Sequence, residues 1–159
     1  MATIENPVRI ERGTSDDLDA VMEVMDSAFG RRFGEAWTRS QCAGILPMAG
    51  VSLMLALDRR EHGTAAFSLS RNVADEAELL LLAVAPAHRR RGIGRSLLND
   101  FIDRARVGGL SRVHLEVRDG NPAIGMYRSA GFSPIGRRRN YYHAPDGQQF
   151  DALTFSLDL

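Results

Sequence analysis

The hydrophobic pattern of the first fifty residues predicts one strand followed by two helices. Residues 8–12 alternate apolar and polar side chains and end at Gly13, as a short strand does. Thr14 or Ser15 can cap a following helix, whose apolar positions recur at helical spacing: Leu18, Val21, Met22, Met25 and Phe29. A second helix is predicted from about Glu35 through Trp37 to Ile45.

The middle of the chain changes to the pattern of strands. Residues 51–58 and 63–71 flank a polar turn, which predicts a hairpin. Residues 78–85 are almost entirely apolar, as expected of a central strand that is buried on both faces. Pro86 ends this strand because it has no N–H to donate to a neighbour.

The second half alternates between helices and strands. A helix is predicted from Gly92 to the stop at Gly108-Gly109, because one apolar stripe runs along it: Ile93, Leu97, Leu98, Phe101, Ile102 and Ala105. A strand follows at 113–117. Asn121 and Pro122 then signal a helix that continues to Gly131. Strands at about 132–138 and 149–157 close the chain, and this order of elements predicts an α+β or mixed α/β domain.

Composition places the chain among ordinary globular proteins. Its 159 residues suit one domain, and 44% apolar with 25% charged residues argues against disorder or a fibrous protein. Residues 79–87 form a run without charged or polar residues, which is far short of the roughly 20 residues that cross a bilayer. Cys42 is the single cysteine, and the N-terminus lacks the features of a secretory signal. We therefore expect a cytoplasmic protein without membrane association.

Charge is segregated along the chain although the formal total is zero. All 20 cationic residues are arginine, which excludes mechanisms that need a lysine. Residues 1–83 carry 8 arginines and 13 acids, whereas residues 84–139 carry 12 arginines and 4 acids. This basic centre either receives an anion such as a phosphate or reflects an incidental preference for arginine.

The segment from Leu81 to Arg95 combines a strand end, a basic turn and a glycine-rich helix start. Free N–H groups and the helix dipole make such a helix start a binding site for anions. Gly92 and Gly94 leave room for the anion to approach the backbone. The segment is neither a P-loop nor a dinucleotide fingerprint, because it lacks Gly-Lys-Ser/Thr and a third glycine.

The spacing Arg89-x-x-Gly92-x-Gly94 in this context resembles the acetyl-CoA motif of the GNAT N-acetyltransferase superfamily. Residues 121–132 (NPAIGMYRSAGF) resemble its second signature. The resemblance implies the GNAT fold over residues 1–159, a mostly antiparallel sheet of six to seven strands flanked by about four helices. It also implies acetyl-CoA as co-substrate, with a coenzyme site formed by Leu82, Ala83, Val84, Arg89, Arg90, Arg91, Gly92, Ile93, Gly94 and Arg95.

Within this superfamily, the sequence is similar in particular to the bacterial ribosomal-protein-alanine N-acetyltransferases, the RimI-like group. It rests on LEVR at 115–118, GRRRNYY at 136–142 and Trp37. This group implies transfer of acetyl to the N-terminal alanine of the eighteenth small-subunit ribosomal protein. A lysine ε-amine or a small amine stays open as acceptor. A non-catalytic module that binds nucleic acid is disfavoured, because Phe101 is the only aromatic residue between Arg89 and Arg112.

The resemblance also assigns roles near the expected reaction. Glu116 corresponds to the general base and Tyr127 to the general acid that protonates the leaving thiolate. Each has an ordinary alternative, since Glu116 can be a solvated strand residue and Tyr127 a core residue. Tyr141 and Tyr142 either line a peptide groove or pack the last hairpin. The arginines at 137–139 form either a solvated charge run or a contact to substrate or RNA.

Asn121 corresponds to a contact with pantetheine, but it stands six residues before Tyr127, whereas the family usually places seven. Asn121 is therefore either a coenzyme contact or only a helix cap. The four histidines show no metal-binding spacing in the sequence, so we expect no metal. A monomer or weak dimer is expected.

Overall fold

The computed structural model describes residues 7–30 and 32–159, and all of its strands belong to one seven-stranded sheet. The strand order is β1-β2-β3-β4-β5-β7-β6, and every neighbouring pair is antiparallel except β4 and β5. The strands are β1 (Val8–Arg12), β2 (Val51–Asp58), β3 (Thr64–Val73), β4 (Glu76–Val84), β5 (Arg112–Arg118), β6 (Ser133–His143) and β7 (Gln149–Asp158).

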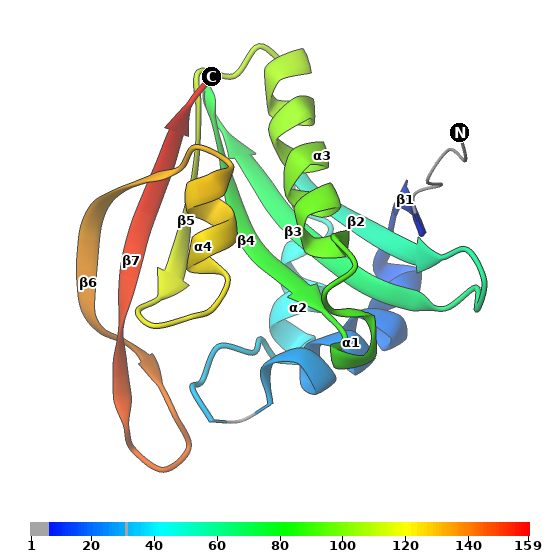
Figure 1. The fold of residues 1–159 in the computed structure, drawn as a ribbon, viewed down its shortest axis with the longest axis horizontal. Coiled ribbons are helices and arrows are strands. Elements are labelled where there is room, and N and C mark those ends of the chain that lie inside the picture. The colour runs from blue at the N-terminus through cyan, green and yellow to red at the C-terminus, as the bar shows by residue number, and fades with distance from the viewer. Residues whose placement is uncertain (1–6, 31) are drawn as a thin grey trace.

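Helices cover both faces of this sheet (Figure 1). The helices α1 (Leu18–Phe29) and α2 (Arg39–Ile45) pack on one face, around Phe67, Leu81 and other apolar side chains of β2 to β4. The helices α3 (Ile93–Val107) and α4 (Ile124–Ser129) cover the other face, around Leu79, Leu115 and Phe155. The apolar stripe predicted for the helix after Gly92 is buried in full along α3.

The sheet divides between its two parallel strands. β4 pairs with β5 only from Glu76 with Arg112 to Leu79 with Leu115, and beyond that point the strands separate (Figure 1). The divergence coincides with a bulge, since Leu69 and Ser70 of β3 pair with Leu81 and Leu79 and leave Leu80 without a partner. The edge of β4 that faces β5 is therefore unpaired from Leu80 to Val84, and its polar groups border a cleft.

The predicted fold class is confirmed, since the described residues form seven strands and four α-helices in the expected order. Thr14 caps the short 3-10 helix Ser15–Asp17 that leads into α1, because its hydroxyl accepts a hydrogen bond from the N–H of Asp16 at 3.2 Å. Strand boundaries differ by a few residues, most at β6, which continues to His143 instead of ending near 138.

The second helix begins later than predicted. α2 starts at Arg39 because Thr38 forms a capping box with Gln41, and Glu35 and Trp37 lie in the preceding loop. The helix after Asn121 is also shorter than predicted, since α4 spans only Ile124–Ser129. Asn121 accepts a hydrogen bond from the N–H of Ala123 at 2.8 Å, so its side chain stabilises the turn before the helix.

Within the described residues, no helix is long and apolar enough to span a bilayer.

Candidate active site

A cavity of about 810 Å³ occupies the cleft between β4 and β5. Both strands contribute to its walls, β4 from Glu78 to Val84 and β5 from Leu115 to Arg118. The remaining walls come from the end of α1, the α1–α2 loop, the start of α3, α4 and β6. The divergence of the two parallel strands thus brings together residues from most of the chain.

One end of the cavity is formed by the last residues of β4 and the start of α3. Gly92 is the N-cap of α3 and has a φ of 75°, a conformation that favours glycine. A Cβ on Gly94 would lie 3.4 Å from Val84 Cγ2 and 3.5 Å from Met126 Sδ, and would narrow the cavity. The first amides of α3 have no partner within the helix and can bind an anion there.

The three arginines before Gly92 have different surroundings. Arg89 donates hydrogen bonds to the carbonyl oxygens of Ala28 at 2.9 Å and Val84 at 3.4 Å, so its side chain joins the loop to α1. Arg91 turns away, with Nη1 3.7 Å from Oδ2 of Asp58. Arg90 lines the cavity, and its guanidinium has no recorded ion pair within the described residues. Arg95, Arg91, Gly92 and Ile93 do not line the cavity.

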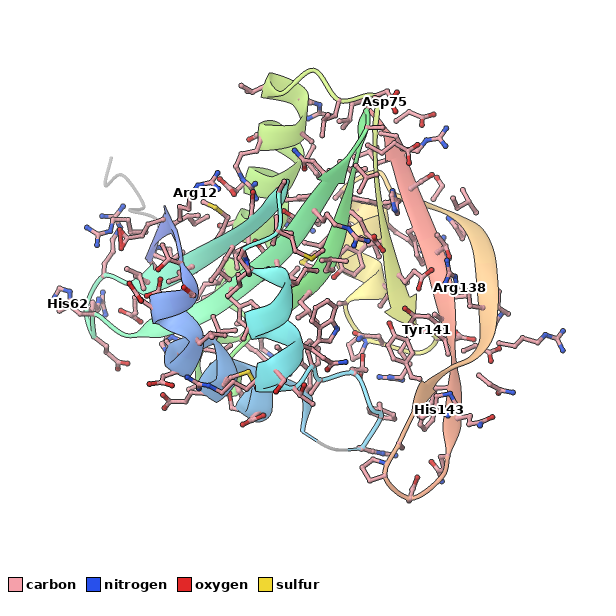
Figure 2. All side chains as sticks on the ribbon, turned by 180° about the vertical axis from the view of Figure 1, so that it is seen from behind. Arg12, His62, Asp75, Arg138, Tyr141 and His143 are labelled. Atoms are coloured by element: carbon pink, nitrogen blue, oxygen red, sulfur yellow. The ribbon has the colours of Figure 1, made fainter. Side chains whose placement is uncertain are left out.

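Glu116 lies on β5 with its side chain in the cavity, where it is only 12% exposed. Its Oε1 forms an ion pair with Nε of Arg138 at 2.7 Å, and Arg138 is 63% exposed. Tyr141 also forms a hydrogen bond with Glu116, and burial followed by the negative charge of Glu116 raises the pKa of Tyr141. Arg138 and Tyr141 lie close together on the side of β6 and β7 (Figure 2). The Glu116 carboxylate is thus fixed in position by Arg138 and largely buried from solvent.

Tyr127 reaches the same cavity from α4. Its ring packs edge-to-face on Phe132, with the ring centres 6.0 Å apart. Burial raises the pKa of Tyr127 well above its usual value, and the charge of Glu35 adds to the shift. The hydroxyl therefore stays protonated at neutral pH.

Tyr141 and Tyr142 both line the cavity, where their rings meet edge-to-face with centres 5.0 Å apart. Burial raises the pKa of Tyr142, and the charge of Glu35 contributes. Both tyrosines therefore border the cavity from the β6 side, next to Glu116.

A buried charged group at the cavity wall, Glu35, is one that the sequence pattern does not predict. The Oε1 atom of Glu35 accepts a hydrogen bond from Arg118 Nε at 3.1 Å, and its Oε2 atom accepts one from Asn121 Nδ2 at 2.9 Å. Glu35 lies 83 residues before Arg118, and no local pattern connects them. Both polar atoms of the Asn121 side chain are engaged, because Oδ1 accepts from Ala123. Asn121 thus joins the α1–α2 loop to the turn after β5.

Comparison with known proteins identifies the family of this fold and cavity. A family model described as the acetyltransferase (GNAT) family matches residues 18–132. The chain belongs to the GNAT acetyltransferase family. The match includes β4, the start of α3, β5 and α4, which form most of the cavity wall.

Several relatives of this GNAT chain carry one name. The chain is 41% identical to a [ribosomal protein bS18]-alanine N-acetyltransferase of Salmonella typhimurium, over 92% of this chain and 94% of that protein. It is 43% identical to the protein of the same name from Escherichia coli, over 60% of this chain, and the match spans 64% of that relative's length.

Solved structures agree on the fold. The crystal structure of the ribosomal-protein-S18-alanine N-acetyltransferase from Escherichia coli is 32% identical and superimposes with a TM-score of 0.85, covering 95% of this chain and 93% of the other. Arabidopsis thaliana NAA60 in complex with acetyl-CoA has a TM-score of 0.79 at 18% identity, with 96% of this chain and 98% of the other covered. The latter likeness supports the fold alone.

The α1–α2 loop of this GNAT chain is held against the last hairpin. The Phe33 ring packs edge-to-face on Phe150, with centres 5.1 Å apart, and the Arg118 guanidinium lies 3.6 Å from the centre of the Phe33 ring. Gly34 has a φ of 69°, and a Cβ there would collide with the carbonyl oxygen of His143. This close approach closes one wall of the cavity.

Replacing Gly34 with alanine is expected to lower the free energy of unfolding by about 1–3 kcal/mol, because the backbone must shift at a strained position. Urea denaturation measures the change. Gly44→Ala is the matched control. Gly44 lies inside α2 with nothing within 4 Å of an added Cβ, so this change should be neutral or stabilising. Equal effects of the two changes would contradict the packing described for Gly34.

One group of metal-ligating side chains exists within the described residues, although the histidines show no metal-binding spacing in the sequence. Asp58, Glu61 and His88 each place one donor atom within 4.8 Å of the others. The guanidinium of Arg91 already lies 3.7 Å from Oδ2 of Asp58. The positive charge of Arg91 therefore already accompanies the Asp58 carboxylate. We assign these three side chains a structural role in the loop rather than metal binding.

Proposed function

We propose that this protein transfers the acetyl group of acetyl-CoA to the N-terminal α-amine of a protein. The observation that carries the proposal is the shared cavity of Glu116 and Tyr127, which begins at the glycine-rich start of α3. The names of the relatives support the N-terminal alanine of the eighteenth small-subunit ribosomal protein as acceptor.

The residues at the start of α3 fit the diphosphate of acetyl-CoA. The αL cap at Gly92, the missing side chain at Gly94 and the free amides of the first turn suit an anionic group. Arg90 adds a positive charge at the same end of the cavity. Acetyl-CoA supplies an acetyl group that is activated as a thioester. The unpaired edge of β4 near Val84 offers N–H groups that would polarise a carbonyl oxygen.

Glu116 acts as the general base in this proposal. An α-amine has a pKa near 8, so at neutral pH it is mostly protonated and must lose a proton before it attacks. Glu116 is the carboxylate that lines the cavity on β5, and it accepts this proton directly or through a water molecule. Arg138 is exposed enough to turn outward and leave Glu116 to the incoming ammonium group.

Tyr127 acts as the general acid. The thiolate of the coenzyme leaves more readily when it is protonated, and a buried tyrosine keeps its proton for this step. No covalent enzyme intermediate and no metal ion are needed in this scheme. Direct transfer between the two bound substrates suffices.

The charge of the cavity supports a cationic acceptor. Away from the start of α3, its wall carries Glu35, Glu78 and Glu116, and of their arginine partners only Arg118 lines the cavity, whereas Arg71 and Arg138 approach from outside it. An ammonium group is therefore favoured there by Coulomb attraction. This feature suits an α-amine, and it equally suits the alternative acceptors, a lysine ε-amine or a small amine.

A panel of acceptors separates these possibilities. We expect acetylation of a peptide that begins with alanine to have a kcat/KM at least about tenfold above that of the same peptide with a blocked N-terminus and an internal lysine. Mass spectrometry of the products locates the acetyl group. A preference for lysine side chains or for free polyamines would contradict the α-amine assignment.

We also infer that residues 1–159 form one acetyltransferase domain, because all seven strands join one sheet. The cytoplasmic location, the monomeric or weakly dimeric state and the absence of direct nucleic-acid contacts stay predictions.

A further inference from the structure

A buried carboxylate lies behind the loop that leads into α3, outside the cavity. Asp58 is the last residue of β2, and its side chain is 7% exposed. Two side chains of the loop between β4 and α3 lie next to the Asp58 carboxylate, those of His88 and Arg91. The mechanism proposed above uses none of these three side chains as an acid or base.

The two oxygens of Asp58 have separate partners. Oδ1 accepts hydrogen bonds from the N–H groups of Arg60 at 2.7 Å and Glu61 at 3.1 Å, which stabilise the β2–β3 turn. Oδ2 lies 3.4 Å from His88 Nδ1 and 3.7 Å from Arg91 Nη1. The two backbone hydrogen bonds, followed by the nearby positive charges, lower the pKa of Asp58. Asp58 is therefore an anion that stabilises its own turn and attracts the loop.

The loop needs such support because its backbone is unusual. Arg90 has a φ of 65°, in a region that L residues other than glycine seldom adopt. On one side of this residue, Arg89 is bound to the carbonyl oxygen of Ala28. On the other side, Arg91 faces Asp58. Arg90, which lines the cavity, is thus held between two attachments.

We propose that Asp58 is a positioning residue for the diphosphate-binding loop. Its charge attracts Arg91, next to the partly buried His88 ring, and through Arg91 it keeps Arg90 and the amides of α3 in the arrangement that receives the diphosphate of the coenzyme. The proposal rests on the proposed function in one respect, that acetyl-CoA binds at the start of α3. It also gives Arg91, assigned by resemblance to the coenzyme site, the role of an attachment instead of a phosphate ligand.

The reason for an effect on affinity is conformational. When the loop adopts other conformations, only the fraction of protein molecules with the loop in the binding conformation can bind the coenzyme. The apparent affinity for the coenzyme then falls in proportion to that fraction. Once acetyl-CoA is bound, the reacting groups Glu116 and Tyr127 are unaffected. Loss of the Asp58 charge should therefore weaken coenzyme binding and leave the saturated rate unchanged.

The test is calorimetric titration of Asp58→Asn with coenzyme A. Asparagine keeps an oxygen that can accept from Arg60 and Glu61, so the change removes the charge and spares the turn. We expect the Kd for coenzyme A to rise about tenfold and the kcat at saturating acetyl-CoA to stay within about twofold of wild type. Glu61→Gln is the matched control, because it removes a carboxylate from the same turn that forms no recorded ion pair with the loop, and it should leave the Kd unchanged.

Two further measurements separate positioning from other roles. S-acetylpantetheine lacks the diphosphate, so its kcat/KM should be equal in wild type and Asp58→Asn. Arg91→Met, at a side chain that is 52% exposed, should raise the Kd for coenzyme A to a similar extent, and the double variant should be no weaker than either single one. Arg91→Met alone tests the attachment if Asp58→Asn does not fold.

The outcomes are distinct. An unchanged Kd in Asp58→Asn, or additive losses in the double variant, would overturn the positioning role. Equal losses in Glu61→Gln and Asp58→Asn, both reversed by added divalent cation, would replace it with a metal site. A wild-type protein that binds coenzyme A but acetylates no peptide would contradict the proposed acceptor and leave the inference on Asp58 intact.

Discussion

Glu116→Gln is expected to lower kcat by about 10²–10⁴-fold while the Kd for coenzyme A stays within about twofold of wild type. The amide has nearly the same shape as the carboxylate, but it cannot accept the proton of the attacking amine. Glu116 lies on a strand that is paired with β7 along its length, so the change should not disturb the sheet. Steady-state kinetics with an alanine-leading peptide, together with calorimetry, measure the two quantities.

Glu78→Gln is the control for this experiment. Glu78 also lines the cavity, but it lies on β4 and its carboxylate is paired with Arg71 of β3 at 3.2 Å. We expect this variant to keep most of its rate. Normal turnover in Glu116→Gln, or an equal loss in both variants, would remove Glu116 as the base.

Tyr127→Phe is expected to lower kcat by about 10²-fold, at the lower end of the range for loss of a general acid, because a thiolate is a moderately good leaving group even without protonation. Phenylalanine keeps the edge-to-face contact with Phe132, so the fold and the coenzyme affinity should be retained. The raised pKa of Tyr127 means that its hydroxyl is still protonated in moderately alkaline solution. The wild-type kcat should therefore not decline between about pH 8 and pH 10 through ionisation of this group.

The pH profile and the variant test the same assignment in different ways. A wild-type rate that falls with a pKa near that of free tyrosine would contradict the buried acid. Full activity of Tyr127→Phe would assign the tyrosine to the core, the alternative that its sequence position left open.

The sequence predicted those features that depend on local pattern. Each of these features lies within one short stretch of the chain: the apolar stripe on α3, the strand that ends before Pro86, and the glycines at 92 and 94. The structure confirms the strand and the helix that they predict. Glu116 and Tyr127 were placed by resemblance, and the divergence of β4 and β5 brings both to one cavity.

The features that the sequence did not predict depend on contacts between distant segments. The sequence pattern predicts a helix that includes Glu35, but Thr38 caps α2 and leaves Glu35 in the loop, where it reaches Arg118 and Asn121. The pairing of Asp58 with His88 and Arg91 likewise joins a hairpin turn to a loop beyond the next strand. Each of these groups is polar, so hydrophobic periodicity carries no signal for it.

The contacts of Asn121 in the structure differ from the contact that the family motif implies. The family pattern implies a pantetheine contact, and one residue fewer before Tyr127 left a cap as the alternative. The side chain both stabilises the turn before α4 and donates to Glu35. A coenzyme contact from Asn121 would use its remaining amide hydrogen, and it stays a prediction.

A crystal structure of the protein with acetyl-CoA would show whether the coenzyme occupies the cleft between β4 and β5. We expect the diphosphate on the first amides of α3 beside Arg90, and the thioester in the cleft, with its sulfur toward Tyr127 and its carbonyl carbon on the side of Glu116. Coenzyme bound elsewhere, with this cleft filled only by water, would contradict this expectation.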